Sequence, residues 1–183
     1  MSDLLWAPIE DGVSRCFGKS QRFYLETLFF GRSGPWGKLY SWGVCELLDD
    51  PQFPGYGAFL SEGHAANDPE GRMLAEVRCR YLADALDRLV TALDSGAEWA
   101  DKTDPLGRTG QSHIIDVPGA MLTRFCRPGS HLVEPTWVVS VVHPDGNELI
   151  ELDSGQAETL DAAGVAGMAR VRELAAGLRE VVS

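Results

Sequence analysis

Cysteine is scarce in this sequence, and its four residues, Cys16, Cys45, Cys79 and Cys126, form no C-x-x-C pair. Zinc ribbons and thioredoxin-like redox sites need such pairs, so the spacing excludes both. Each cysteine adjoins apolar sequence, and an isolated cysteine commonly behaves as a small buried hydrophobe. We expect the four to serve as core residues.

Long apolar runs are also missing. The longest stretch without a charged residue is PQFPGYGAFLS, residues 51–61, and it contains two prolines. A membrane-spanning helix needs about 20 apolar residues, so we predict no membrane partner. The N-terminal MSDLLWAPIED lacks the basic start and the apolar stretch of a signal peptide, which predicts a cytoplasmic protein.

Clustered positive charge is the third absence. The chain has 27 acidic and 16 basic residues, a net charge of −11, and the acidic excess runs through the whole sequence. Proteins that neutralise nucleic-acid phosphates need grouped Lys and Arg, so we predict no direct contact with nucleic acid. The acidity could instead mimic a nucleic acid and capture a basic protein, or only keep the protein in solution.

Two stretches come close to a phosphate-binding loop, GVSRCFGKS (12–20) and GRSGPWGKL (31–39). The pattern G-x-x-x-x-G-K-[ST] has four residues between its glycines, whereas both stretches have five. In the second, Leu39 also stands where the metal-binding hydroxyl is needed. We therefore predict no nucleotide hydrolysis and no cofactor.

Two long segments have apolar residues at helical spacing, residues 68–95 and 161–181. Asp68 is the predicted N-cap of the first helix and Gly96 its stop. The second contains three glycines, which lower helix propensity and need a reason. We interpret them as points of close approach to the sheet of the same chain or to a second copy; they are Gly164, Gly167 and Gly177.

Elsewhere the apolar period changes to two, which is typical of strands. The predicted strands are residues 22–30, 38–48, 112–117, 121–128, 136–142 and 148–152. The first of these segments could also be a short helix that begins after Ser20 and ends at Gly31. Short turns join neighbours in this series, which indicates antiparallel pairing, and residues 49–67 and 97–111 look like long connections. We expect one α+β domain over residues 1–183, a two-layer sandwich of a mostly antiparallel sheet of about six strands with two amphipathic helices.

Aromatic side chains gather in GRSGPWGKLYSWG, residues 31–43. Trp36, Tyr40 and Trp42 lie within seven residues, with Lys38 between them. Burial in the core is one explanation. The other is an interaction patch, because aromatics beside Gly and Pro offer rigid contact area. The predicted partner-binding residues are Trp36, Lys38, Tyr40 and Trp42.

Histidines with a carboxylate nearby in sequence offer a catalytic alternative. His113 precedes Asp116, His131 precedes Glu134, and both histidines flank the hairpin predicted over residues 112–128. Such groups could form an acid/base or metal site, or they could be loop residues with local hydrogen bonds. We assign no catalytic residue and no metal.

These features favour a non-enzymatic, acidic binding or regulatory protein that contacts another protein or a second copy of itself. The alternative is a small enzyme that uses His113 and His131 with Asp116 or Glu134. The frequent Ala, Gly, Arg and Asp are typical of a GC-rich bacterial genome or its phages. An accessory or mobile-element inhibitor is one form that such a binding protein could take.

Overall fold

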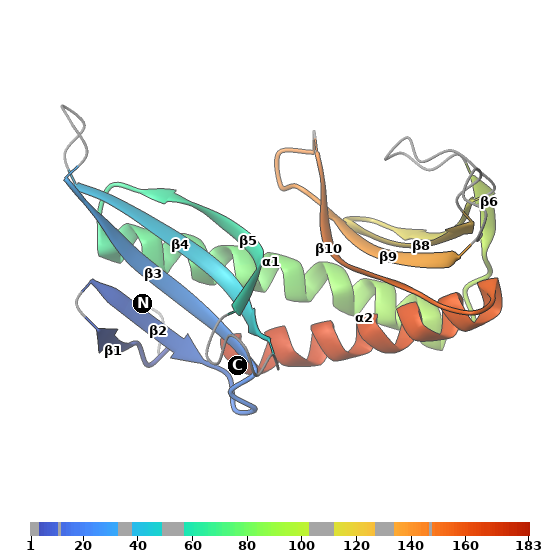
Figure 1. Ribbon diagram of the computed structural model, residues 1–183, viewed down its shortest axis with the longest axis horizontal. Helices are drawn as coiled ribbons and strands as arrows, with labels where there is room; N and C mark the ends of the chain where they lie inside the picture. The colour runs from blue at the N-terminus through green and yellow to red at the C-terminus, as the bar shows by residue number, and fades with distance from the viewer. Residues whose placement is uncertain are drawn as a thin grey trace. The chain divides into compact units, whose positions relative to one another are not determined.

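The computed structural model describes residues 4–10, 12–32, 38–48, 57–102, 112–126, 134–146 and 148–183 (Figure 1). In these ranges the chain is α+β, with two antiparallel five-stranded sheets and two helices. The strand orders are β1-β2-β3-β4-β5 and β10-β9-β8-β7-β6, so each sheet is a meander of sequence neighbours. None of these helices is long and apolar enough to cross a bilayer.

Each sheet is followed in sequence by one long helix (Figure 1). The first sheet consists of β1 (Ala7–Glu10), β2 (Val13–Phe17), β3 (Phe23–Arg32), β4 (Lys38–Leu47) and β5 (Gly57–Ala65), and α1 (Asp68–Asp94) follows it. The second consists of β6 (Ala100–Lys102), β7 (Ser112–Val117), β8 (Ala120–Cys126), β9 (Pro135–Val142) and β10 (Leu149–Gln156), and α2 (Leu160–Val182) follows it.

The chain forms two compact units. Unit 1 comprises residues 1–83 and 176–183, and unit 2 comprises residues 84–175. Both helices therefore contribute to both units, with α1 passing from unit 1 to unit 2 and α2 passing back. The single domain over residues 1–183 stays a prediction.

The α+β class, the antiparallel pairing and the two helices are confirmed, and in place of one sheet of about six strands the described residues form two sheets of five. The supposed connection of residues 49–67 contains β5, whose sequence GAFLSEGHA has two glycines and no Val, Ile, Thr, Tyr or Trp and so has weak strand propensity. The connection of residues 97–111 contains β6, which has only three residues. Strands β1 and β2 were not expected either, and together these four additions make two sheets.

Each helix begins at a side-chain cap. In α1 the cap is Asn67 and not Asp68, because the Glu70 N–H donates to Asn67 Oδ1 at 2.9 Å. The Glu70 carboxylate accepts the Ala66 N–H at 2.8 Å in return, which completes a reciprocal box. Thr159 caps α2 by accepting the Ala162 N–H at 3.1 Å. The predicted stop of the first helix, Gly96, has a positive φ of 79°.

The three glycines of α2 lie against side chains of the chain's own sheets. In unit 1 a Cβ on Gly177 would lie 2.1 Å from the ring of Phe23. In unit 2 a Cβ on Gly167 would lie 2.7 Å from Leu122 Cδ1, and one on Gly164 would lie 3.0 Å from an Arg124 nitrogen. Close packing on the sheet of the same chain therefore explains these glycines.

Both units place a tryptophan of the fourth strand beside a glycine of the fifth. Trp42 pairs with Gly63 in unit 1, and Trp137 pairs with Gly155 in unit 2. A Cβ on either glycine would lie 2.5 or 2.6 Å from the indole ring. The helix cap, Asn67 or Thr159, follows four residues after the glycine in both cases.

The third strand repeats this correspondence. Thr27 lies opposite Trp42, and Arg124 lies opposite Trp137. The Thr27 hydroxyl lies 2.6 Å from Asp68, and the Arg124 guanidinium 3.0 Å from Asp161. Both acids stand in the first turn of the following helix. Each unit thus ties its third strand to its helix start by one polar contact.

Candidate functional site

Sheet 1 buries one face against α1, and no helix among the described residues of unit 1 covers its other face (Figure 1). Thr27 and Trp42 define the helix side, since Thr27 bonds Asp68 and Gly71 of α1 lies close to both. Side chains alternate along a strand, so Tyr24, Glu26 and Leu28 point the other way. We call that side the open face of unit 1.

Strand register arranges the open face as three rows that cross the sheet. The charged row consists of Arg15, Glu26, Gly43 and Glu62. The aromatic row consists of Phe17, Tyr24, Cys45 and Phe59. The third row consists of Glu10, Val13, Leu28, Ser41 and His64. Members of all three rows, together with Gly57, line a hollow of about 360 Å³.

An ion pair forms part of the hollow. Arg15 Nε lies 2.6 Å from Glu26 Oε2, and the two side chains are only 22% and 12% exposed. The guanidinium also lies 4.8 Å from the centre of the Tyr24 ring. Burial, the largest single influence, lowers the pKa of Arg15, but the hydrogen bond and the charge of Glu26 together with nearby Tyr24 and Cys45 raise it overall. The Arg15 guanidinium is therefore charged at neutral pH.

Two buried neutral groups lie beside this pair. Tyr24 and Cys45 are 2% and 0% exposed. Burial raises the pKa of Tyr24 well above its ordinary value, and the neighbouring Cys45 adds to the effect. Burial also raises the pKa of Cys45 to about 12, with a further contribution from Glu26. Cys45 is thus a thiol at neutral pH and a poor nucleophile.

The aromatic row ends in exposed rings. Phe17 is 37% and Phe59 51% exposed. Gly43 leaves the space that Phe59 uses, because a Cβ there would lie 2.5 Å from the Phe59 ring. Of the nine large exposed apolar side chains among the described residues, eight belong to unit 1 and only Val165 to unit 2. The eight are Leu5, Ile9, Phe17, Phe30, Leu48, Phe59, Met73 and Val77.

Two of the predicted partner-binding residues, Tyr40 and Trp42, lie on β4 and point to the other side of the sheet. Trp42 is 7% exposed and lies on the helix side, among the buried apolar residues. Tyr40 is half-buried, with its ring 5.1 Å from that of Phe29. Lys38 begins β4, and Trp36 lies outside the described residues. The partner-binding role of Trp36, Lys38, Tyr40 and Trp42 stays a prediction.

For the alternative site built on histidines, the structure gives His113 a different carboxylate partner from the expected one. His113 Nδ1 lies 2.7 Å from Asp101 Oδ1, while Asp116 stands three residues along β7 and so faces the opposite side. Glu134 is exposed, and His131 lies outside the described residues. Among the residues that the structure describes, no three His, Cys, Asp or Glu side chains group as metal ligands would.

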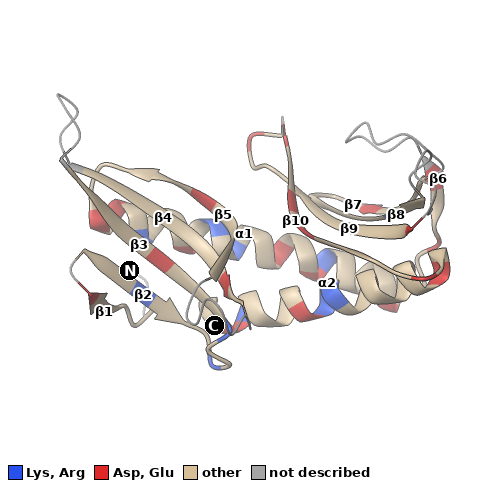
Figure 2. Cartoon of the chain, viewed as in Figure 1, with Lys and Arg blue, Asp and Glu red and all other residues tan. Residues whose placement is uncertain are grey.

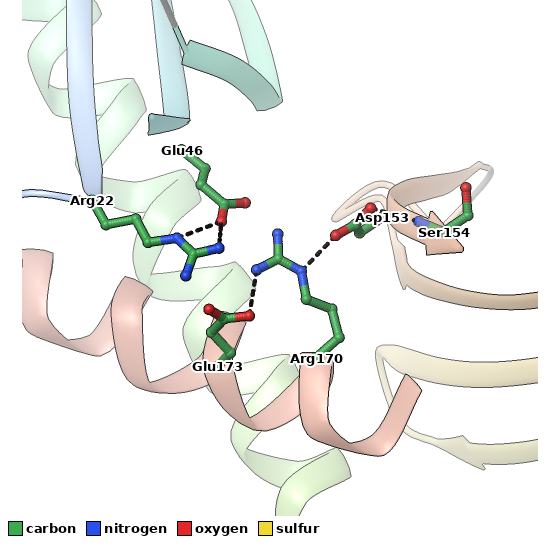
Figure 3. Close-up of polar contacts among 6 residues, drawn as sticks. All are labelled: Arg22, Glu46, Asp153, Ser154, Arg170 and Glu173. Atoms are coloured by element: carbon green, nitrogen blue, oxygen red, sulfur yellow. Dashed lines mark hydrogen bonds and ion pairs between the residues drawn. The ribbon is translucent and has the colours of Figure 1, made fainter. Parts of the chain in front are cut away.

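The remaining ion pairs mainly join structural elements (Figure 3). In unit 1, Arg22 donates from Nε at 2.8 Å to the buried carboxylate of Glu46. In unit 2, Arg170 of α2 contacts Asp153 of β10 and Glu173, at 2.5 and 2.8 Å. Both arginines have carboxylate partners already, so we assign them structural roles.

Negative charge is present in both units (Figure 2). Unit 2 has 15 of the 27 acidic residues and 7 of the 16 basic ones, so most of the excess belongs to it. The open face is also acidic, with three glutamates to one arginine in its three rows. The alternation in FYLETL predicts that Tyr24, Glu26 and Leu28 share a face, but the residues that β1, β2 and β5 add were missed with those strands. No protein-family model, curated protein or solved structure matches this chain.

Proposed function

We propose that this chain is a non-enzymatic binding protein that acts through contact with another protein, and that the open face of unit 1 is its contact surface. The observation that carries the proposal is the exposure of Phe17 and Phe59 on an uncovered sheet face, beside a hollow of about 360 Å³. Exposed apolar groups gathered on one surface are typical of interaction sites.

The composition of the face supports a protein partner. Interface centres are enriched in Tyr, Phe and Arg, and a polar margin surrounds them. The open face has the exposed rings of Phe17 and Phe59 in one row and Arg15, which is partly exposed, in the next. Its exposed members, Glu10 and Glu62, supply the polar margin.

The titratable groups support binding over catalysis. A general acid or base works best with a pKa near the operating pH. On the described part of this face, the pKa values of Tyr24 and Cys45 are moved away from neutrality, and Arg15 is held by Glu26. These groups suit recognition, and a regulatory or inhibitory protein is the form that we favour.

A photo-crosslinker tests this proposal in the cells that produce the protein. Phe59→p-benzoylphenylalanine places the reactive group on the open face, and Val165→p-benzoylphenylalanine is the matched control at an exposed site of unit 2. We expect one discrete protein adduct from position 59 and none from position 165. A self-adduct would identify a second copy as the partner. Absence of any adduct at 59, or the same adducts at both positions, would contradict the proposal.

A second experiment ties the adduct to the aromatic row. The double variant Phe17→Ser, Phe59→Ser removes exposed apolar surface, so we expect its free energy of unfolding to change by about 1 kcal/mol or less. The protein identified by crosslinking should bind this variant at least tenfold more weakly in calorimetry, and Val165→Ser should bind it normally. Unchanged binding by the double variant would remove the open face from the interface.

A further inference from the structure

We infer that the hollow of the open face receives a cationic side chain, lysine or arginine, from the bound protein. The inference rests on the proposed function and specifies what the partner must present. It is based on the negative charge of the open face, the ion pair that already engages Arg15, and the exposed Phe59 ring that lines the hollow.

Carboxylates outnumber cations on the open face. Glu10 and Glu26 line the hollow, and Glu62 continues the charged row across β5. Arg15 is the one cation in the three rows, and its Nε is engaged by Glu26. A carboxylate accepts more than one donor, so Glu26 can bind a second cation while it holds Arg15. An anion placed in the hollow would meet the carboxylates of Glu10 and Glu26 and an arginine that Glu26 already engages, with Glu62 farther along the same face.

Neighbouring groups respond to this negative field. After burial, Glu26 is the largest cause that raises the pKa of Cys45, and Glu62 raises it too. Arg15 acts in the opposite direction without reversing the shift. The electrostatic effect of the glutamates therefore extends across the face in spite of Arg15.

The rings offer a second attraction for a cation. Arg15 already lies 4.8 Å from the centre of the Tyr24 ring, so this face holds one cation against an aromatic surface. Phe59 is half exposed and lines the same hollow. A volume of about 360 Å³ is within the range of sites that enclose a ligand group, which is room enough for one long side chain.

Three short peptides test the inference. They are acetyl-Leu-Arg-Leu-amide, the same peptide with neutral citrulline in place of arginine, and the same peptide with glutamate. Titration of the ¹⁵N-labelled full chain by NMR gives both the affinity and the site. We expect the arginine peptide to shift the amides of Glu10, Glu26 and Phe59, with binding at least tenfold tighter than for citrulline. Added salt should weaken it, because the partly exposed charges are screened.

Charge variants assign the effect to the hollow. Glu10→Gln with Glu62→Gln should weaken the arginine peptide about fivefold or more, and Glu158→Gln, an exposed acid of unit 2, should leave its affinity unchanged. Equal binding of arginine and citrulline, tighter binding of glutamate, shifts confined to other residues, or no shifts at about 10 mM peptide would each overturn the inference.

The two proposals fail separately. If position 59 crosslinks to a protein but the arginine peptide is not preferred, the contact surface stands and the cation is wrong. If the arginine peptide binds in the hollow but position 59 gives no adduct, the preference of the hollow for a cation is supported and the proposed contact with a protein partner is contradicted.

Discussion

Units 1 and 2 have the same packing arrangement on the side of the sheet that faces a helix. Trp42 and Trp137 are 7% and 8% exposed, each with a glycine of the next strand under its ring. In both units the helix cap and the polar tie from the third strand follow at corresponding places. The two units thus share one arrangement of tryptophan, glycine, helix cap and polar contact, which we call the scaffold.

The opposite faces of the two sheets differ. On unit 2 many of the side chains that point away from α2 are buried, among them Ile114, Phe125 and Val138. Three hydroxyls lie among them on adjacent strands, in diagonal register. They are Ser112, Thr123 and Ser140, and within the part of the chain that the structure describes they have no hydrogen-bond partner.

This contrast distinguishes the residues that stabilise the fold from the residues that are exposed to a partner. Unit 1 exposes rings and charges on its open face, whereas unit 2 buries apolar groups and hydroxyls on the corresponding side. Since the helix sides match, the difference lies outside the shared scaffold. We therefore look for binding on unit 1.

Removal of the paired tryptophans should have the largest effect. Trp42→Ala and Trp137→Ala should each lower the free energy of unfolding by about 3–5 kcal/mol, because each leaves a large cavity between sheet and helix. Chemical unfolding followed by circular dichroism measures this. Trp6→Ala, at a half-buried site, should cost clearly less. If Trp42→Ala costs no more than Trp6→Ala, Trp42 is not a core residue and the scaffolds do not match.

Alkaline pH should lower the stability of unit 1. Burial raises the pKa of Cys45 and that of Cys79 to about 12, and both lie in unit 1. Their contribution to stability is complete below the unfolded pKa of about 8.5 and is lost as pH rises towards 12, at up to about 1.4 kcal/mol per pH unit for each thiol. Under reducing conditions, Cys45→Ala with Cys79→Ala should flatten the fall in unfolding free energy between about pH 9 and 11. An unchanged slope would contradict this prediction.

Methyl groups on the paired glycines should cost less than the loss of the rings. Gly63→Ala and Gly155→Ala each force a Cβ into an indole ring, and we expect a loss of about 1–2 kcal/mol in both units. The exposed neighbours His64 and Gln156 provide controls, and their replacement by Ala should change stability by about 0.5 kcal/mol or less. A large loss in one unit alone would break the correspondence.

Replacement of a threonine by valine should change the free energy of unfolding in opposite directions in the two units. Thr27→Val removes a hydroxyl bonded to Asp68 at 2.6 Å, so it should destabilise unit 1 by about 1 kcal/mol. Thr123→Val removes a buried hydroxyl that has no partner, so it should stabilise unit 2 by up to about 1 kcal/mol. Thermal unfolding of the two variants measures the difference. The same sign in both would show that the Thr123 hydroxyl is satisfied.

Periodicity predicted the long elements well and the short ones poorly. Helix α1 was expected over residues 68–95 and runs over Asp68–Asp94, and β7 was expected over residues 112–117 and forms there. These segments bury a face, so their apolar spacing is regular. Strands β5 and β6 were missed because one is rich in Gly and polar residues and the other has three residues.

The candidate site was harder to predict for the same reason. Tyr24 and Glu26 alternate with Leu25 and Thr27 in the sequence, so their common face could be inferred. Their partners Arg15 and Glu62 come from other strands and depend on register, which no local pattern contains. The repeat also escaped notice, because only isolated positions such as Trp42 and Trp137 correspond.

The α+β class, the two helices, the antiparallel pairing of neighbouring strands and the acidity could all be read from the amino-acid sequence, because they follow from local spacing, turns and composition. The division into two sheets, the burial of Trp42 and the common row of Arg15, Glu26 and Glu62 could not. They depend on strand register and burial, which arise from contacts between residues far apart in the chain.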